Sequence, residues 1–150
     1  MTKSIQEIQD EIIEEFSMLE NRDDIYEYII EIGKKLPELA PEHKTEQNLI
    51  RGCQSKVWLI ASLDANENLI FLGDSDAMIV RGLINLLIRV MSGQSPEAIL
   101  NCQLYLIEKI GMRQIISSGR SNGLTAMIKQ MKLYALAFQT KLESEALGNS

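Results

Sequence analysis

The 150-residue sequence has few of the side chains that build metal centres and nucleophilic active sites. It contains one histidine and two cysteines, whereas a structural zinc site normally takes four Cys or His ligands. We therefore expect no metal ion and no cluster bound to this chain. The glycine-rich phosphate loop, the G-x-S-x-G pattern of serine hydrolases and the H-E-x-x-H pattern of zinc proteases are also missing.

Positive charge and long apolar segments are scarce as well. The chain has 15 Lys and Arg against 21 Asp and Glu, a formal net charge of -6, and no cluster of basic residues that would attract nucleic acid. Its most apolar segment, residues 77–91, is interrupted by Arg81, Asn85 and Arg89 and falls short of the roughly 20 apolar residues that a membrane span needs. The first residues lack the apolar core of a signal peptide. We expect a cytoplasmic protein that binds neither nucleic acid nor membranes.

What the chain does contain is enough apolar material for one core. Hydrophobic residues make up 45% of the sequence, which at this length indicates a single domain spanning residues 1–150. The two cysteines, Cys53 and Cys102, could form a disulfide in principle. Since nothing else in the sequence is typical of a secreted protein, we expect two free thiols in a reducing compartment.

Two segments near the start carry apolar side chains at helical spacing. The first stripe consists of Ile5, Ile8, Ile12, Phe16 and Leu19, and the second of Ile25, Ile29, Ile32 and Leu36. The polar residues 21–24 suit the start of the second helix, and Pro37 suits its end. Residues 38–51 are mostly polar and predict a surface connection that includes at most a short helical turn.

The middle of the chain changes to strand-favouring residues. Residues 57–63 and 69–72, separated by the turn residues 64–68, predict a β-hairpin. Residues 77–91 are apolar on most of their circumference and predict a central helix, for which Asp74, Ser75 or Asp76 would be the cap.

Further helices are predicted toward the end of the chain. A Ser-Pro-Glu start at residue 95 indicates a helical region that runs to about Ile110, and a last helix is predicted after residues 121–123. Because strands and helices do not alternate, a doubly wound sheet is excluded. The order of elements predicts an α+β fold with a small antiparallel sheet, built on the hairpin, that packs against several helices.

Cys53 is the strongest candidate for chemistry. It lies between a polar connection and a predicted strand, and Gly52 before it can adopt turn conformations that leave room around the sulfur. A thiol must be deprotonated to act as a nucleophile, and the neighbouring Arg51 could lower its pKa. Burial as a small packing residue is the competing interpretation.

Three other residues, Cys102, His43 and Trp58, have plainer explanations, whereas Arg120 calls for a partner. Cys102 lies among apolar neighbours in a predicted helix, where packing accounts for it, and His43 lies in a polar segment typical of solvent-exposed histidines. Trp58, the only tryptophan, is expected to pack in the core. Arg120 precedes a predicted helix start, where the helix dipole disfavours a cation, so we expect it to contact Asp74 or Asp76.

Three ordered blocks of sequence, together with a fourth segment upstream, resemble the SufE family of sulfur-acceptor proteins. The blocks are Gly52-Cys53-Gln54-Ser55-Lys56-Val57-Trp58-Leu59, Gly73-Asp74-Ser75-Asp76-Ala77 with Ile79-Val80-Arg81-Gly82-Leu83-Ile84 after it, and Arg120-Ser121-Asn122-Gly123-Leu124 with Ala126-Met127. The upstream segment, residues 28–37, is similar to the family's second helix and its exit. The resemblance covers nearly the whole chain.

The resemblance implies that Cys53 accepts sulfur as a persulfide from a SufS-type cysteine desulfurase, stimulates that enzyme, and delivers the sulfur to a SufBCD-type iron–sulfur scaffold. Pyridoxal phosphate would belong to the partner, and this chain would hold no cofactor and would not be an enzyme by itself. The loop around Cys53 would shield the sulfur and swing outward. Asp76 and Arg120 would support the loop, and the fold would be similar to that of IscU scaffold proteins.

Several alternatives stay open at this point. The chain could be a regulatory module that binds a desulfurase without using its cysteine, a stand-alone cysteine-dependent hydrolase with His43 as the base, or a scaffold that builds a cluster on itself. We expect a monomer or a weak dimer. The particular desulfurase, the resting position of the Cys53 loop and the final sulfur acceptor are not specified by the sequence.

Overall fold

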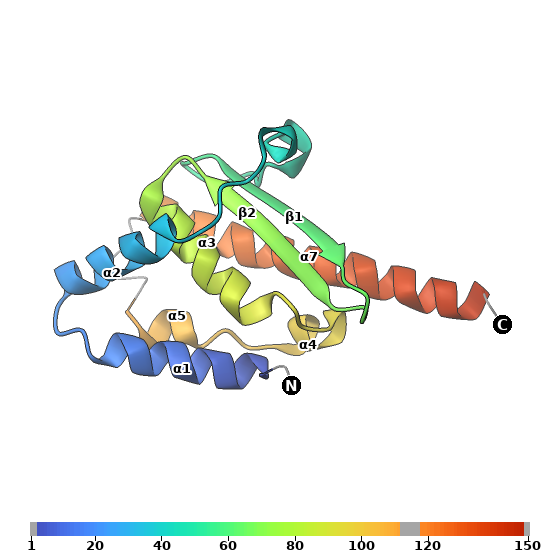
Figure 1. Cartoon of the computed structure of the whole chain (residues 1–150), viewed down its shortest axis with the longest axis horizontal. Helices are drawn as coiled ribbons and strands as arrows, with labels where there is room; N and C mark the ends of the chain where they lie inside the picture. Colours follow the sequence, from blue (N-terminus) through green and yellow to red (C-terminus); the bar gives the residue numbers. More distant parts are fainter. Residues whose placement is uncertain (1–2, 112–117, 149–150) are drawn as a thin grey trace.

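The structure is a computed structural model that describes residues 3–111 and 118–148, leaving out the side chains of residues 118–122. Its elements are α1 (Ile5–Ser17), α2 (Arg22–Lys34), the 3-10 turns η1 (Pro41–His43) and η2 (Glu46–Asn48), β1 (Val57–Leu63), β2 (Leu69–Ser75), α3 (Met78–Met91), α4 (Pro96–Asn101), α5 (Leu106–Lys109) and α7 (Ser118–Gly148). The sheet of the described ranges is the antiparallel pair β1–β2 (Figure 1). The predicted α+β fold is confirmed.

The first two helices begin at side-chain caps, of which only the cap of α2 lies among the residues predicted to start a helix. In α1 the Ser4 hydroxyl accepts a hydrogen bond from the Glu7 amide, and the Glu7 carboxylate accepts one from the Ser4 amide, which forms a capping box. In α2 the Asn21 side chain accepts a hydrogen bond from the Asp24 amide at 2.9 Å. Both predicted helices are therefore present, with the second ending two residues before Leu36.

One aspartate, Asp64, stabilises the turn of the hairpin. Asp64 Oδ1 accepts hydrogen bonds from the amides of Asn66 and Asn68, which holds the turn between the strands. The register runs from Leu63 opposite Leu69 to Val57 opposite Ser75. The second strand therefore continues to Ser75, beyond the predicted end at Leu72, because its last residues still pair with the start of β1.

The central helix α3 packs against both α2 and the hairpin, as predicted from its apolar circumference. Helices α2 and α3 approach so closely that only glycine fits at the crossing. A Cβ at Gly82 would overlap the Ile29 carbonyl oxygen, and one at Gly33 would overlap the Met78 carbonyl oxygen. These two glycines thus allow the backbones to touch and fix how α3 lies beneath the site.

The predicted caps of α3 are wrong. Its N-cap is Ala77, without a side-chain hydrogen bond, because Asp74 and Ser75 are still in β2. Asp74 is buried instead, and it accepts hydrogen bonds from the amides of Leu39 and Ser75 and forms ion pairs with Arg81 and Lys44. The carboxylate therefore joins the connection after α2 to the end of the hairpin and to α3.

The C-terminal helices differ from their predicted bounds. The region from Ser95 to Ile110 is divided into α4 and α5, and Cys102 is the C-cap of α4 with an extended backbone. Helix α7 begins at Ser118 rather than after residues 121–123. It crosses the molecule along the hairpin and projects beyond the other elements at its C-terminal end (Figure 1).

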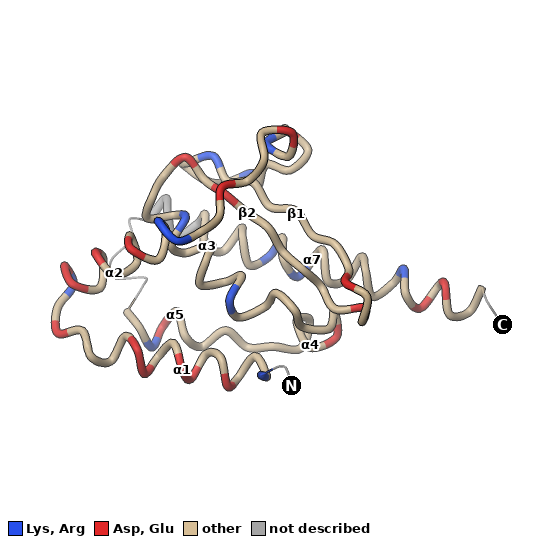
Figure 2. The backbone as a smooth tube through the Cα atoms, viewed as in Figure 1, with Lys and Arg blue, Asp and Glu red and all other residues tan. Residues whose placement is uncertain are grey.

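Charge is distributed unevenly over these elements. Acidic residues line α1 and α2, as Figure 2 shows, while the basic residues lie mostly elsewhere. Among the helices in the described part of the chain, none is both long and apolar enough to cross a membrane.

Candidate functional site

The loop that carries Cys53 spans Arg51 to Lys56 and is closed at its base by a backbone hydrogen bond. The Ile50 amide donates to the Val57 carbonyl at 2.8 Å, so the two ends of the loop lie side by side. Within the loop, Gly52 has a φ angle of +90°, a conformation that residues with a Cβ rarely adopt. The glycine therefore makes the turn that brings Cys53 back toward the protein.

The far end of the loop is fastened to the end of β2. The Lys56 amide donates to Asp76 Oδ1 at 3.1 Å, and the Lys56 carbonyl accepts hydrogen bonds from the Ser75 hydroxyl at 2.7 Å and from the Asp76 amide at 3.3 Å. The structure thus brings the predicted site residue Asp76 to the Cys53 loop. Its contact is with the loop backbone, so it positions the loop.

The Cys53 side chain is half-buried and points toward α7. Its thiol donates a long hydrogen bond to the Gly123 carbonyl, with 3.8 Å between the sulfur and the oxygen. A Cβ at Gly123 would lie 3.4 Å from the Cys53 sulfur, so the absence of a side chain there leaves the sulfur its space. The start of α7 therefore forms one wall of the site.

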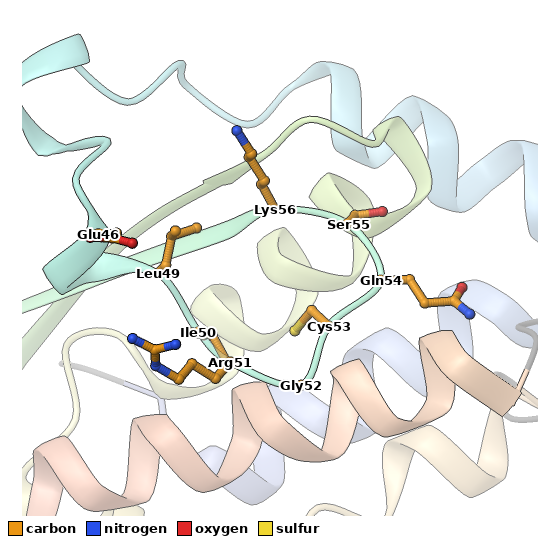
Figure 3. Close-up of a pocket in the computed structure, with 9 residues that line it drawn as sticks. All are labelled: Glu46, Leu49, Ile50, Arg51, Gly52, Cys53, Gln54, Ser55 and Lys56. Carbon is orange, nitrogen blue, oxygen red and sulfur yellow. The ribbon is translucent and has the colours of Figure 1, made fainter.

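Two pockets meet at Cys53. The outer one has a volume of about 290 Å³ and follows the loop itself, with Glu46 and Leu49 at its side (Figure 3). The inner one holds only about 10 Å³ beneath the loop. The inner pocket is lined by Cys53, Gln54, Ser55, Val57, Val80, Leu83, Gly123 and Met127. The sulfur thus lies between a larger pocket of mixed polar and apolar lining and a small, mainly apolar one.

Burial sets the protonation of the resting thiol. Removing the thiolate from water raises the pKa of Cys53, and no charged group among the described side chains counteracts this. The expectation that Arg51 lowers this pKa is wrong, because the Arg51 side chain extends away from the sulfur (Figure 3). At neutral pH the closed loop therefore holds Cys53 mainly as the neutral thiol.

The predicted contact of Arg120 falls outside the described side chains and stays a prediction. Its backbone lies in the first turn of α7. Of its two predicted partners, Asp74 is paired with Arg81 and Lys44, and Asp76 holds the loop. Burial alone would raise the pKa of Asp74, but the hydrogen bonds from the Leu39 and Ser75 amides and the charges of Arg81 and Lys44 together hold that pKa below its ordinary value.

The other residues considered from the sequence lie away from the thiol or serve packing. Cys102 is also half-buried, with a pKa raised by burial, and its carbonyl accepts a hydrogen bond from Lys132. The two thiols are free. Trp58 is only half-buried, unlike the predicted core residue, because it faces outward from β1 with the Lys44 ammonium 5.5 Å from its ring centre.

Sequence reasoning missed the contribution of α7 and of the inner pocket. Gly123, Val80, Leu83 and Met127 all belong to the blocks that resemble the SufE family, but the sequence assigns none of them to the surroundings of Cys53. No local signal identifies them, since their proximity to Cys53 depends on how α3 and α7 pack. In the described ranges, no group of three or more His, Cys, Asp or Glu side chains is arranged to hold a metal ion.

These features define a class: a small α+β protein that presents one half-buried cysteine on a closed loop between two pockets. The profile of the SufE family, described as an Fe-S metabolism associated domain, matches residues 10–135. The chain belongs to the SufE family.

Known relatives agree with this assignment. An uncharacterized SufE-like protein of Rhizobium etli is 43% identical over 127 residues, which cover 82% of this chain and 86% of that protein. A second uncharacterized SufE-like protein, from Rhizobium meliloti, is 42% identical over 127 residues, covering 82% of this chain and 91% of that one. The recognition made from the three sequence blocks is confirmed.

The fold also has a counterpart among solved structures. The solution structure of a hypothetical protein from Thermus thermophilus superposes with a TM-score of 0.72 and covers 89% of this chain and 96% of its own. Its sequence identity is 20%, so the comparison concerns the fold.

Proposed function

We propose that this chain accepts a sulfur atom on Cys53 from a SufS-type cysteine desulfurase and delivers it to a SufBCD-type iron–sulfur scaffold. The observation that carries the proposal is the position of Cys53, on a closed loop with a pocket on each side of the sulfur. Membership of a family described as associated with Fe-S metabolism supports it. The setting would be the cytoplasm, where free thiols persist.

The transfer is a thiol exchange that needs little machinery on the acceptor. The Cys53 thiolate attacks the outer sulfur of a persulfide on the donor cysteine, the donor's sulfur–sulfur bond breaks, and the donor cysteine leaves as a thiolate. Cys53 then carries a persulfide, with no net oxidation. Pyridoxal phosphate, held by the desulfurase, supplies the carbon–sulfur cleavage there, and this chain acts as co-substrate and activator rather than as an enzyme.

On this proposal, the closed loop seen here and an open loop would serve different steps. In the closed loop, burial keeps Cys53 protonated and the Gly123 carbonyl accepts its proton in a hydrogen bond. Opening the loop would return the sulfur to water, lower its pKa and expose it to the donor. The outward swing that the family resemblance implies would therefore also activate the nucleophile.

A cysteine-dependent hydrolase would need a base beside the Cys53 thiol, and none of the described side chains forms a hydrogen bond with it. A cysteine nucleophile in such enzymes is paired with a side chain that accepts its proton. Here the hydrogen bond of Cys53 goes to a backbone carbonyl, and His43 lies in η1 with its carbonyl bonded to Asn48. The geometry thus favours a carrier over an independent hydrolase.

The deciding experiment is intact-mass spectrometry after incubation with a SufS-type desulfurase, pyridoxal phosphate and cysteine. We expect a gain of about 32 Da that a thiol reductant removes, since one sulfane sulfur has been added. Cys53→Ser is expected to abolish the gain and Cys102→Ser, the matched control at the other half-buried thiol, to leave it intact.

Two outcomes contradict the proposal. A wild-type protein that gains no sulfur, or one that gains it on Cys102, is not a carrier through Cys53. If Cys53→Ser still stimulates the desulfurase fully, the chain is instead a regulatory module that does not use its cysteine.

A further inference from the structure

A groove between the start of α1 and the end of α4 is separate from the sulfur site. It has a volume of about 430 Å³, and none of its lining residues lines either pocket at Cys53. The Cys53 thiol meets α7 at Gly123, whereas Cys102, which lies in the groove, is bonded through its carbonyl to Lys132. Those two positions are about 14 Å apart along the helix. Figure 1 shows the first turns of α1 beside α4.

The lining of this groove is rich in amides and uncharged. Of its ten described lining residues, five carry a primary amide and none carries a charge. Since charged residues make up 24% of the chain, an uncharged lining of this size is unusual for the protein. A charged ligand would lose its hydration here without meeting an opposite charge. The groove therefore suits an uncharged ligand. The five amides are those of Gln6, Gln9, Gln94, Asn101 and Gln103.

Gln94 directs an unused hydrogen-bond acceptor toward the groove. The residue is 8% exposed, and its side-chain nitrogen donates to the Lys3 carbonyl at 2.8 Å. Its side-chain oxygen accepts no hydrogen bond from any described residue, yet no fully buried side-chain oxygen in that part of the chain lacks a partner. The Gln94 oxygen therefore reaches solvent, and the groove that Gln94 lines supplies the opening. A ligand in the groove can donate to it.

The segment that follows α4 offers a backbone donor. It is held in place by Gln9, which is 1% exposed, donates to the Gln103 carbonyl at 3.0 Å and accepts from the Leu106 amide at 3.2 Å. Cys102 has an extended backbone, and the amide of the next residue, Gln103, donates to no described residue. The groove is thus bordered by extended chain with an available N–H, the arrangement that pairs with another extended chain.

We infer that this groove binds an uncharged, extended peptide segment of a partner protein. A peptide group carries one N–H donor and one carbonyl acceptor, which match the acceptor of Gln94 and the backbone donor of Gln103. The exposed side-chain amides of Gln6 and Asn101 both donate and accept, so they can pair with further peptide groups. The groove volume lies within the range of roughly 300–1,000 Å³ that is usual for ligand sites. This binding site is independent of whether Cys53 carries sulfur.

Cys102 allows the ligand class to be tested by disulfide exchange, because it lies in the groove. In a Cys53→Ser parent it is the only thiol. The probes are N-acetylated peptide amides that begin with cysteine, joined through that cysteine to 2-mercaptoethanol by a disulfide bond. The Cys102 thiolate attacks the peptide's sulfur, 2-mercaptoethanol leaves as its thiolate, and the peptide stays on the protein with no net oxidation. Added 2-mercaptoethanol reverses the exchange. The concentration that leaves half of the protein labelled measures how strongly the groove holds the peptide.

Three peptides and one sugar are compared by intact-mass spectrometry. We expect the peptide Cys-Asn-Ser-Asn to withstand about tenfold more 2-mercaptoethanol than Cys-Asp-Ser-Asp or Cys-Lys-Ser-Lys, because only the neutral peptide avoids placing a charge in the groove. The corresponding disulfide of 1-thioglucose, which is neutral but has no peptide group, should behave like the charged peptides. Equal values for all four probes, capture of none, or strongest capture of the sugar or of a charged peptide overturn the inference.

Two variants test whether the neutral peptide lies in the groove. Gln94→Met removes the acceptor at similar side-chain length, and Gln6→Ala removes an exposed amide at little risk to folding. Each should lower the half-labelling concentration by about threefold, the effect of one hydrogen bond, while alkylation of Cys102 by iodoacetamide stays within about twofold. Gln47→Ala, at an exposed amide in η2, is the matched control and should equal the parent. A neutral peptide held equally by the parent and by both groove variants binds elsewhere, which overturns the inference.

Discussion

At the scale of single residues, two ionisable groups hold opposite states because their surroundings differ. Cys53 loses water and gains no positive neighbour among the described side chains, so its pKa rises. Asp74 is more deeply buried, yet two amides and two cations hold its pKa low. The structure thus favours the neutral form of the Cys53 thiol and the charged form of the Asp74 carboxylate.

The reactivity of Cys53 is predicted to shift to higher pH in the folded state. Because burial raises its pKa, the rate of alkylation by iodoacetamide should rise with pH through a midpoint above that of the same residue in urea. The measurement is a pH–rate profile of the Cys102→Ser protein in both states. A folded-state midpoint at or below the unfolded one would show that a cation does reach the sulfur.

Asp74→Asn is predicted to destabilise the protein by about 3 kcal/mol at neutral pH, because Arg81 and Lys44 lose their buried partner. The folded pKa of Asp74 is depressed, so its stabilisation is present above the unfolded pKa and is lost as pH falls through the folded one. Urea denaturation at neutral pH and at a pH below 3.8, the ordinary pKa of an aspartate, should therefore show the difference between variant and wild type shrinking on strong acidification. Glu20→Gln, at an exposed acid between α1 and α2, is the control.

At the scale of elements, the site depends on contacts between segments far apart in the sequence. The Cys53 loop is held by the end of β2 at one side and faces α7 at the other. Helix α3 forms the floor through Val80 and Leu83. None of these elements forms the site alone. A change in how the helices pack should therefore alter the accessibility of the Cys53 thiol.

Whether Asp76 holds the Cys53 loop closed can be tested directly. Asp76→Ala removes the acceptor of the Lys56 amide, so the loop should open more often and Cys53 should be alkylated about tenfold faster, the effect of losing one hydrogen bond of ~1.4 kcal/mol. The measurement is the iodoacetamide rate at neutral pH. Asp23→Ala, an exposed acid on α2, should leave that rate unchanged; an unchanged rate in Asp76→Ala would mean that other contacts close the loop.

The crossing of α2 and α3 predicts a large effect of a single methyl group. Gly82→Ala should destabilise the protein by about 3 kcal/mol, because its Cβ meets the Ile29 backbone rather than a flexible side chain. Chemical denaturation of this variant beside Gly148→Ala provides the comparison. A loss below about 1 kcal/mol would mean that the two helices separate easily.

At the scale of the whole molecule, the sequence predicts where the helices and strands lie better than it predicts which of them pack together. The first two helices follow from apolar periodicity, the hairpin from strand-favouring and turn residues, and the central helix from its apolar circumference, all of which are local signals. Asp74 was misassigned as a cap because its partners Leu39 and Arg81 come from other elements. The inner pocket was missed for the same reason, since Val80 and Met127 meet only after α3 and α7 pack.

The projecting end of α7 is predicted to be dispensable for folding. Residues 141–148 are exposed apart from the half-buried Leu142, so ending the chain after Thr140 should change the free energy of unfolding by less than about 1 kcal/mol. Ending it after Lys129 removes the buried Met131 and Ala135 and should prevent folding. Circular dichroism with urea denaturation distinguishes these outcomes, and a large loss in the first truncation would contradict the prediction.

The raised pKa of Cys53 has a consequence for the return of sulfur as well as for its uptake. In thiol exchange a sulfur with a high pKa is a poor leaving group. On the proposed function, a persulfide in the closed loop is therefore attached to an atom that resists departure, and stray cellular thiols would extract its outer sulfur slowly. Once the loop opens and water lowers that pKa, the same atom departs readily. One movement would then decide both when sulfur arrives and when it is given up.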